Sequence, residues 1–131
     1  MGKLTATIAK GDTTYGAWIE DVAGIYGQGD TVEEAKQSLN ESLQLYKKHN
    51  TILPPALQGE VEFEYKFDAP SFLTHYATVF TTSSLERMTG ISQAQLPQYV
   101  SGFKKPSPKV AMKMDKAIHS FAHELQQVRF A

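Results

Sequence analysis

Residues 83–107 read SSLERMTGISQAQLPQYVSGFKKPS and carry the most specific pattern in the chain. A short helix at 83–89 is expected to end at Gly90, because glycine permits a sharp turn with positive φ. A second helix is expected at 92–101, followed by a lysine-rich loop. Two short helices with a glycine turn between them are typical of a helix-turn-helix.

Four apolar residues have the spacing needed to hold these two helices together: Leu85, Ile91, Leu96 and Tyr99. The second helix would then expose a polar side. Glutamine can donate to and accept from an adenine edge, which suits readout in the major groove. A serine cap, the N–H groups of a helix end and nearby lysines suit DNA phosphates. The predicted DNA-binding residues are Ser92, Gln93, Ala94, Gln95, Gln98, Lys104 and Lys105.

Two residues depart from the usual pattern of such a unit. Glu86 stands where a small residue usually packs against the second helix. Pro97 lies inside the expected second helix, where it removes a backbone hydrogen bond and costs up to ~3 kcal/mol if the helix is regular. Either the helix is kinked, or its regular part begins near Pro97 and leaves Gln93 and Gln95 in the turn. An ordinary helical hairpin with a solvated lysine pair is the alternative interpretation.

The rest of the second half is expected to be helical. One helix starts at 68–71 and carries apolar residues as far as Phe80. A long helix follows Pro108, with apolar residues three and four apart, so one of its faces should be buried. Those residues are Val110, Met114, Ala117, Ile118, Phe121, Leu125 and Val128. The length of this helix predicts that part of it packs against a second subunit.

The first half is expected to contain three strands, a helix and a fourth strand, an order written βββαβ. Apolar and polar residues alternate in the strands, as in a sheet with one buried face. The predicted strands are 3–8, 15–19, 25–26 and 61–67, with Trp18 on the other face of the second strand. The helix is predicted at 31–49, because Thr31 and Glu34 form a capping box at its start.

The charges are separated along the chain. The chain has 13 Lys and Arg against 14 Asp and Glu, and a net charge of -1 by itself argues against a nucleic-acid binder. Residues 1–70 hold six lysines and 11 acids, a net -5, whereas residues 71–131 hold seven basic residues and three acids, a net +4. We therefore predict two domains, an α+β partner-binding domain at 1–69 and a helical DNA-binding domain at 70–131.

Composition excludes several classes of protein. The 131 residues are 41% hydrophobic and 21% charged, which is typical of a soluble globular protein and not of a disordered one. The chain has no cysteine, which excludes a disulfide scaffold, a thiol nucleophile and thiolate zinc sites. No apolar run approaches the ~20 residues that span a bilayer, and residues 1–10 lack the apolar core of a signal peptide. We expect a cytoplasmic protein with no membrane partner.

The chain resembles HicB-type antitoxins. Residues 20–46, EDVAGIYGQGDTVEEAKQSLNESLQLY, match the N-terminal unit of that family, in which QGDT-x-EEA leads into the helix. The second half resembles the phage-repressor-like helix-turn-helix that some members carry. The family motif before the helix is close to P-D-L-P-G, and residues 20–24, Glu-Asp-Val-Ala-Gly, lack both prolines. The resemblance implies an α+β fold: a degenerate ribonuclease-H-like βββαβ unit, which has lost its catalytic acids, followed by an all-α helix-turn-helix unit.

The resemblance also implies a function, with two partners. The first unit would neutralise a small HicA-like RNA-cleaving toxin, and the second would repress the operon by binding operator DNA. An acidic surface competes electrostatically for such a basic toxin. We expect a homodimer or higher oligomer that needs no cofactor, and the candidate toxin-binding residues are Glu20, Asp21, Tyr26 and Gln28. The alternatives are a stand-alone HicB-like regulator, or an interaction and dimerisation protein that binds neither DNA nor a toxin.

Two further groups of residues are not expected to carry chemistry. His119 and His123 have a helical spacing that can bind zinc, but no third ligand is evident. Four acids could be mistaken for a nuclease cluster that needs a divalent metal: Asp12, Glu20, Asp21 and Asp30. They occur in turns and caps, where Asp and Glu are common. We therefore predict no metal site and no enzymatic activity, and a nuclease activity lost on Asp21→Ala would contradict this.

Overall fold

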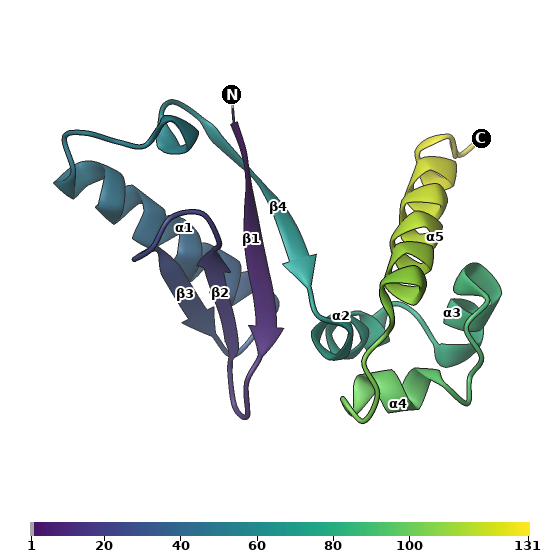
Figure 1. Cartoon of the computed structure of the whole chain (residues 1–131). Coiled ribbons are helices and arrows are strands. Elements are labelled where there is room, and N and C mark those ends of the chain that lie inside the picture. The colour runs from purple at the N-terminus through teal and green to yellow at the C-terminus, as the bar shows by residue number, and fades with distance from the viewer. Residues whose placement is uncertain (1) are drawn as a thin grey trace. The chain divides into compact units, whose positions relative to one another are not determined.

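The computed structural model describes residues 2–131. These residues form two compact units, and the boundary along the chain falls between Ser71 and Phe72. Its class is mixed α+β, a four-stranded sheet followed by helices (Figure 1). The first unit contains β1 (Gly2–Lys10), β2 (Tyr15–Ile19), β3 (Tyr26–Gly29), α1 (Val32–His49), a 3-10 turn (Pro55–Leu57) and β4 (Val61–Phe67). Next come α2 (Ala69–His75), a second 3-10 turn (Tyr76–Thr78), α3 (Thr82–Thr89), α4 (Leu96–Val100) and α5 (Pro108–Gln126).

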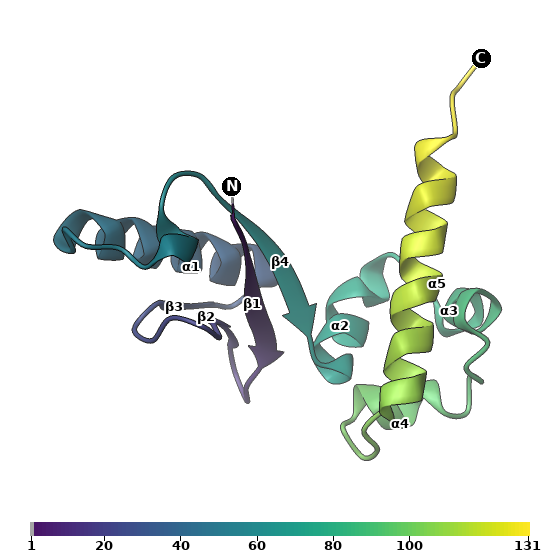
Figure 2. The ribbon, with the colours of Figure 1, turned by 45° about the horizontal axis from the view of Figure 1, so that its top comes forward.

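The sheet has the strand order β3-β2-β1-β4. β1 pairs antiparallel with β2 and parallel with β4, and β2 pairs antiparallel with β3. A parallel pair needs a crossover connection, which α1 supplies between β3 and β4. Figure 2 shows α1 lying along one face of the sheet. The four predicted strands are confirmed, although the third runs from Tyr26 to Gly29 instead of occupying 25–26.

The core of the first unit lies between α1 and the sheet. Alternate residues of β1 and β2 face the helix, and the helix presents its predicted apolar stripe to them. Fully burying one of these larger apolar side chains stabilises the fold by about 1.5–3 kcal/mol. The buried residues include Leu4, Ala6, Ile8, Ala17, Ile19, Val32, Ala35, Leu39 and Leu43.

The Thr31 cap predicted at the start of α1 is confirmed, whereas the Glu34 side chain accepts from the N–H of Asp30 and not from that of Thr31. The Glu34 N–H donates to Thr31 Oγ1 at 3.1 Å, and the Asp30 N–H donates to Glu34 Oε2 at 2.8 Å. Two backbone donors that a helix start leaves without partners are thus satisfied.

α1 lies directly against β3. A Cβ atom added at Gly27 would overlap the backbone N of Leu39 and lie 2.7 Å from the carbonyl C of Ser38, so only glycine permits this approach. At the outer edge of β3, the N–H groups of Tyr26 and Gln28 donate to Ser42 Oγ (3.4 Å) and Ser38 Oγ (3.2 Å). The helix therefore supplies acceptors to an edge strand beside which no further strand lies within residues 2–131.

The helices of the second unit differ in detail from the prediction. α2 ends at His75 and gives way to a 3-10 turn, so the regular helix does not reach Phe80. α3 starts at Thr82, because Thr81 Oγ1 accepts from the Ser84 N–H at 3.0 Å and so acts as the cap.

α5 begins at Pro108 as predicted, with Ser107 as its cap. Met114 is buried, and the ring of Phe121 lies 6.1 Å from that of Phe80. Leu125 and Val128 are 52% and 49% exposed, so the expected buried face does not extend to the C-terminal end. No helix within residues 2–131 is both long enough and apolar enough to cross a membrane.

Candidate functional site

The sheet face opposite α1, here called the open face, carries one row of side chains across all four strands. The register pairs Thr7 with Lys66 on one side and with Trp18 on the other, and it pairs Trp18 with Tyr26. Trp18 is 41% exposed and Tyr26 is 69% exposed. Two exposed aromatic rings on neighbouring strands form an apolar surface that suits a protein partner.

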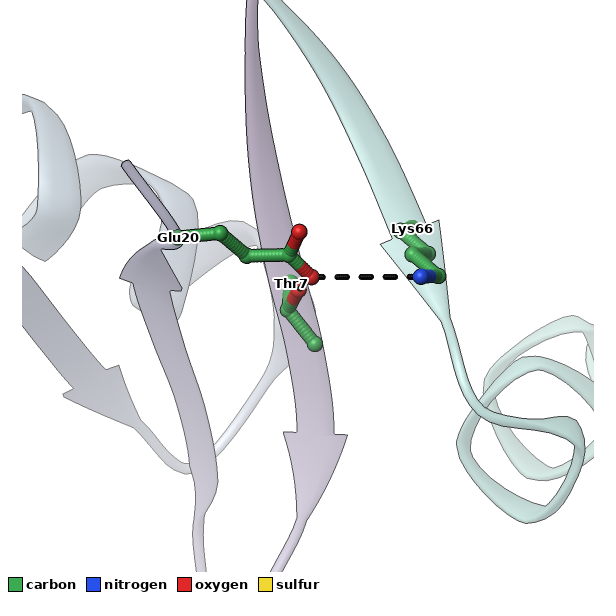
Figure 3. Close-up of polar contacts among 3 residues, drawn as sticks. All are labelled: Thr7, Glu20 and Lys66. Atoms are coloured by element: carbon green, nitrogen blue, oxygen red, sulfur yellow. Dashed lines mark hydrogen bonds and ion pairs between the residues drawn. The ribbon is translucent and has the colours of Figure 1, made fainter. Parts of the chain in front are cut away.

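Glu20 is fixed on the open face by two contacts (Figure 3). Its Oε1 accepts a hydrogen bond from Thr7 Oγ1 at 2.6 Å and lies 3.9 Å from Lys66 Nζ. The three side chains come from β1, β4 and the end of β2. The carboxylate is therefore directed toward β1 and β4 on the open face.

The remaining candidate toxin-binding residues are divided between this face and a turn. Gln28 lies opposite Gly16 in the register, so its side chain is on the open face with Tyr26. Asp21 lies in the exposed turn after β2 and is not on the sheet. The candidate set omitted Trp18, although the alternation of β2 had already placed it on the other face. Its proximity to Tyr26 depends on the strand register, which local sequence does not specify.

In the second unit, α3 and α4 are joined by a compact turn. Gly90 has φ 78°, and its N–H donates to the Glu86 carbonyl at 2.7 Å, which ends α3 as expected. The four apolar residues predicted to hold the two helices together are buried: Leu85, Ile91, Leu96 and Tyr99.

The predicted helix at 92–101 is wrong at its start, because α4 begins only at Leu96. Residues 93–95 form a turn in which the Gln95 N–H donates to Ser92 Oγ at 3.2 Å. Pro97 explains this start. It has no N–H to donate, so it is tolerated in the first turn of a helix and disfavoured further along. Of the two outcomes left open by the sequence, the structure has the late start.

The predicted DNA-binding residues differ in exposure. Gln93, Ala94 and Gln95 are exposed in the turn before α4, and Ser92 is half-buried. Gln98 is also half-buried, and its Oε1 is buried with no hydrogen-bond partner among the described residues, which corrects the expectation that it points outward. It sits on the side of α4 that carries buried residues, one position before Tyr99.

Glu86 of α3 binds the first residue of this turn. Its Oε2 accepts a hydrogen bond from the Gln93 N–H at 2.7 Å. The carboxylate of α3 therefore satisfies a backbone donor of the turn that precedes α4. A small residue at this position, which the usual pattern favours, would leave that donor to solvent.

Basic side chains lie near the exposed turn. Lys104 and Lys105 are exposed in the loop after α4, and the Lys104 N–H donates to the Gln98 carbonyl at 3.2 Å. Lys113 of α5 lies close to Gly90, since its Nζ is 3.2 Å from where a Cβ would be at that glycine. The second unit thus combines exposed amide side chains with nearby cations.

Metal ligands do not gather in the described part of the chain. Among residues 2–131 no three His, Asp or Glu side chains are placed to hold a metal ion. His119 Nδ1 lies 3.4 Å from Asp115 Oδ2, one turn earlier on α5, and both side chains are exposed.

Comparisons with protein-family models, with curated proteins and with solved structures returned no match for this chain.

Proposed function

We propose that this protein is an antitoxin and repressor, with a degenerate ribonuclease-H-like first unit and a helix-turn-helix second unit. The first unit binds and neutralises a HicA-like RNA-cleaving toxin, and the second binds operator DNA. The observation that carries the proposal is the exposed turn Gln93–Ala94–Gln95 before α4, which is joined to α3 by the Glu86–Gln93 hydrogen bond and flanked by the buried Ile91 and Leu96.

The turn has the chemistry that reading a DNA groove requires. Gln93 and Gln95 carry amides that can bond to base edges, and Ala94 can contact a thymine methyl group. Lys104 and Lys105 can contact phosphates, and the second unit has a net charge of +4 to attract the duplex. Because Gln98 is half-buried, it supports α4 and is not proposed as a base contact.

DNA binding can be tested by measuring affinity for the DNA upstream of its own gene at several salt concentrations. Lys104→Ala with Lys105→Ala should weaken binding to every sequence and reduce the slope of log K against log salt by about 1.8, since each phosphate contact contributes about 0.9. Lys47→Ala with Lys48→Ala makes the same charge change in the first unit and is the control. If the wild-type chain shows no salt-dependent DNA binding, the DNA-binding half of the proposal is wrong, and an interaction and dimerisation protein is favoured.

The toxin is proposed to bind the open face. The exposed Trp18 and Tyr26 rings supply apolar contact area, and the first unit has a net charge of -5 that suits a basic toxin. Trp18 is the single tryptophan of the chain, so its fluorescence reports directly on this face.

The toxin interaction can be tested with the product of a small basic reading frame beside this gene. Its addition should change the Trp18 emission. In calorimetry, Tyr26→Ala should raise the Kd by about 30-fold, as expected for a central aromatic contact worth about 2 kcal/mol. Ile52→Ala removes an exposed apolar side chain away from the sheet and should leave the Kd unchanged. DNA binding without any such partner would favour a stand-alone regulator.

A further inference from the structure

β4 is an edge strand with an unpaired side. The strand order places it beside β1, and no strand within residues 2–131 lies beyond it. Four of its residues are exposed: Glu62, Glu64, Tyr65 and Lys66. At the opposite edge of the sheet, the α1 serines accept from the outer N–H groups of β3. An uncovered strand edge offers backbone donors and acceptors to an additional strand.

The sequence of β4, VEFEYKF, is complementary to itself when a second copy runs antiparallel and the pairing is centred on Glu64. Glu62 of each copy then lies opposite Lys66 of the other, on the open face. On the α1 face Phe63 lies opposite Tyr65, and Val61 lies opposite Phe67 at the ends. Opposite charges and aromatic pairs across strands each contribute about 0.2–1 kcal/mol.

Neighbouring registers are less favourable. If both copies keep α1 on the same side of the joined sheet, the register can shift only by an even number of residues. An odd shift would place residues of the open face opposite residues of the α1 face. One even shift centres the pairing on Phe63 and places Glu62 opposite Glu64, and the other centres it on Tyr65 and places Glu64 opposite Lys66. Both shorten the overlap from seven paired residues of β4 to five, and the first also opposes acids. The register centred on Glu64 is preferred because it has the longest overlap and keeps the Glu62–Lys66 pairs.

The register centred on Glu64 places the two copies of this residue opposite each other, and each copy has its own cation. Lys3 Nζ lies 3.6 Å from Glu64 Oε1 in each chain. On the other face, Lys36 Nζ lies 4.2 Å from the centroid of the Tyr65 ring, which already lies 5.8 Å from the Phe63 ring. A second copy would extend this aromatic pair across the junction.

We propose that two copies of this chain join their sheets through antiparallel β4 strands centred on Glu64. The interface is isologous, with a two-fold axis passing through the Glu64 pair. It is formed by residues of β4, and it does not depend on the antitoxin assignment.

Single cysteine substitutions test this register, because the full chain contains no cysteine. Opposed residues of antiparallel strands have Cα atoms about 4.5–5.5 Å apart, within the range of a disulfide. Glu64→Cys should therefore give a dimer on non-reducing gels after mild oxidation with diamide. In Glu62→Cys or Lys66→Cys the like thiols are four residues out of register, about 13 Å apart, and each variant alone should stay unlinked. A mixture of these two variants should cross-link.

The outcomes separate this interface from others. A wild-type chain that is monomeric by sedimentation at all concentrations would overturn the proposal, as would a dimer in which Glu64→Cys does not cross-link. Linking of Glu62→Cys alone would overturn the register. As a charge test, Glu62→Lys should raise the dimer Kd about ten-fold by opposing Lys66, and Glu62→Lys with Lys66→Glu should restore it.

Discussion

The Glu86 carboxylate accepts a hydrogen bond from the Gln93 backbone N–H at 2.7 Å, across the turn between α3 and α4. This contact supplies the protein's own anion to a backbone donor of the turn before α4. Phosphates often bind such donors. Ser92 is similarly engaged, as its hydroxyl oxygen accepts from Gln95. A phosphate near this turn therefore depends more on Lys104 and Lys105 than on the helix start.

Glu86→Ala is expected to destabilise the second unit by about 0.5–1.5 kcal/mol, the net contribution of one hydrogen bond. Glu86→Gln should be nearly as stable as the wild type, because its amide oxygen still accepts the hydrogen bond. Urea unfolding followed by circular dichroism measures the stability, and hydrogen exchange at the Gln93 amide reports the contact itself. Unchanged Gln93 protection in Glu86→Ala would show that this carboxylate does not hold the turn.

Gly27→Ala is expected to prevent α1 from packing on β3. The added Cβ would overlap the backbone of Leu39, and neither element can move without losing the core. The cost should reach at least about 3 kcal/mol, the upper part of the range for overpacking. Gly16→Ala is the matched control in the neighbouring strand, because its nearest contact would be the Trp18 ring at 3.9 Å. Equal unfolding free energies for the two variants would contradict the close approach.

Ser38→Ala should expose the edge of β3. The Gln28 N–H loses its acceptor, and the expected loss of stability is about 0.5–1.5 kcal/mol. The specific sign is faster hydrogen exchange at the Gln28 amide in NMR spectra. Ser38→Thr retains a hydroxyl and should retain the protection. If the Gln28 amide exchanges as slowly in both variants as in the wild type, a group other than Ser38 protects this N–H of β3.

Stability should fall at alkaline pH because of Tyr15. Burial raises the pKa of its phenol above the ordinary 10.0, and the Asp68 and Glu33 carboxylates raise it further. The folded chain thus holds this proton more tightly than the unfolded chain. The contribution is complete below pH 10 and decreases above it by about 1.4 kcal/mol per pH unit until the folded phenol ionises. Urea unfolding between pH 8 and 11 should show a smaller decrease for Tyr15→Phe, with Tyr26→Phe as the control for loss of one exposed phenol.

Local signals in the sequence predicted the elements whose ends are set by local chemistry. α1 begins as predicted because the Thr31 side chain accepts from the Glu34 N–H and the Glu34 side chain accepts from the Asp30 N–H, all within five residues. The start of α3 was less certain from sequence, since residues 81–84 are all Ser or Thr and any of them can cap a helix. Packing of Leu85 and the contacts of Thr81 select one of them.

Tertiary pairing explains what the sequence did not predict. Pro97 is compatible with a kink or a late start, and the local sequence does not choose between them. Gln98 looked like its exposed neighbours because a polar residue on a short helix carries no sign of burial. On the sheet, the row formed by Trp18 and Tyr26 follows from strand register, which depends on turn geometry between them.

The two edges of the sheet differ, and this difference limits assembly. Because Ser38 and Ser42 already accept from the N–H groups of Gln28 and Tyr26, the β3 edge is less suited to pairing than the β4 edge. Each sheet then has one edge available for pairing, so the proposed assembly stops at two copies. A sheet that could pair at both edges would add further copies without limit, as amyloid-forming strands do. Ser38 and Ser42 of α1 thus disfavour the addition of a further sheet at the β3 edge.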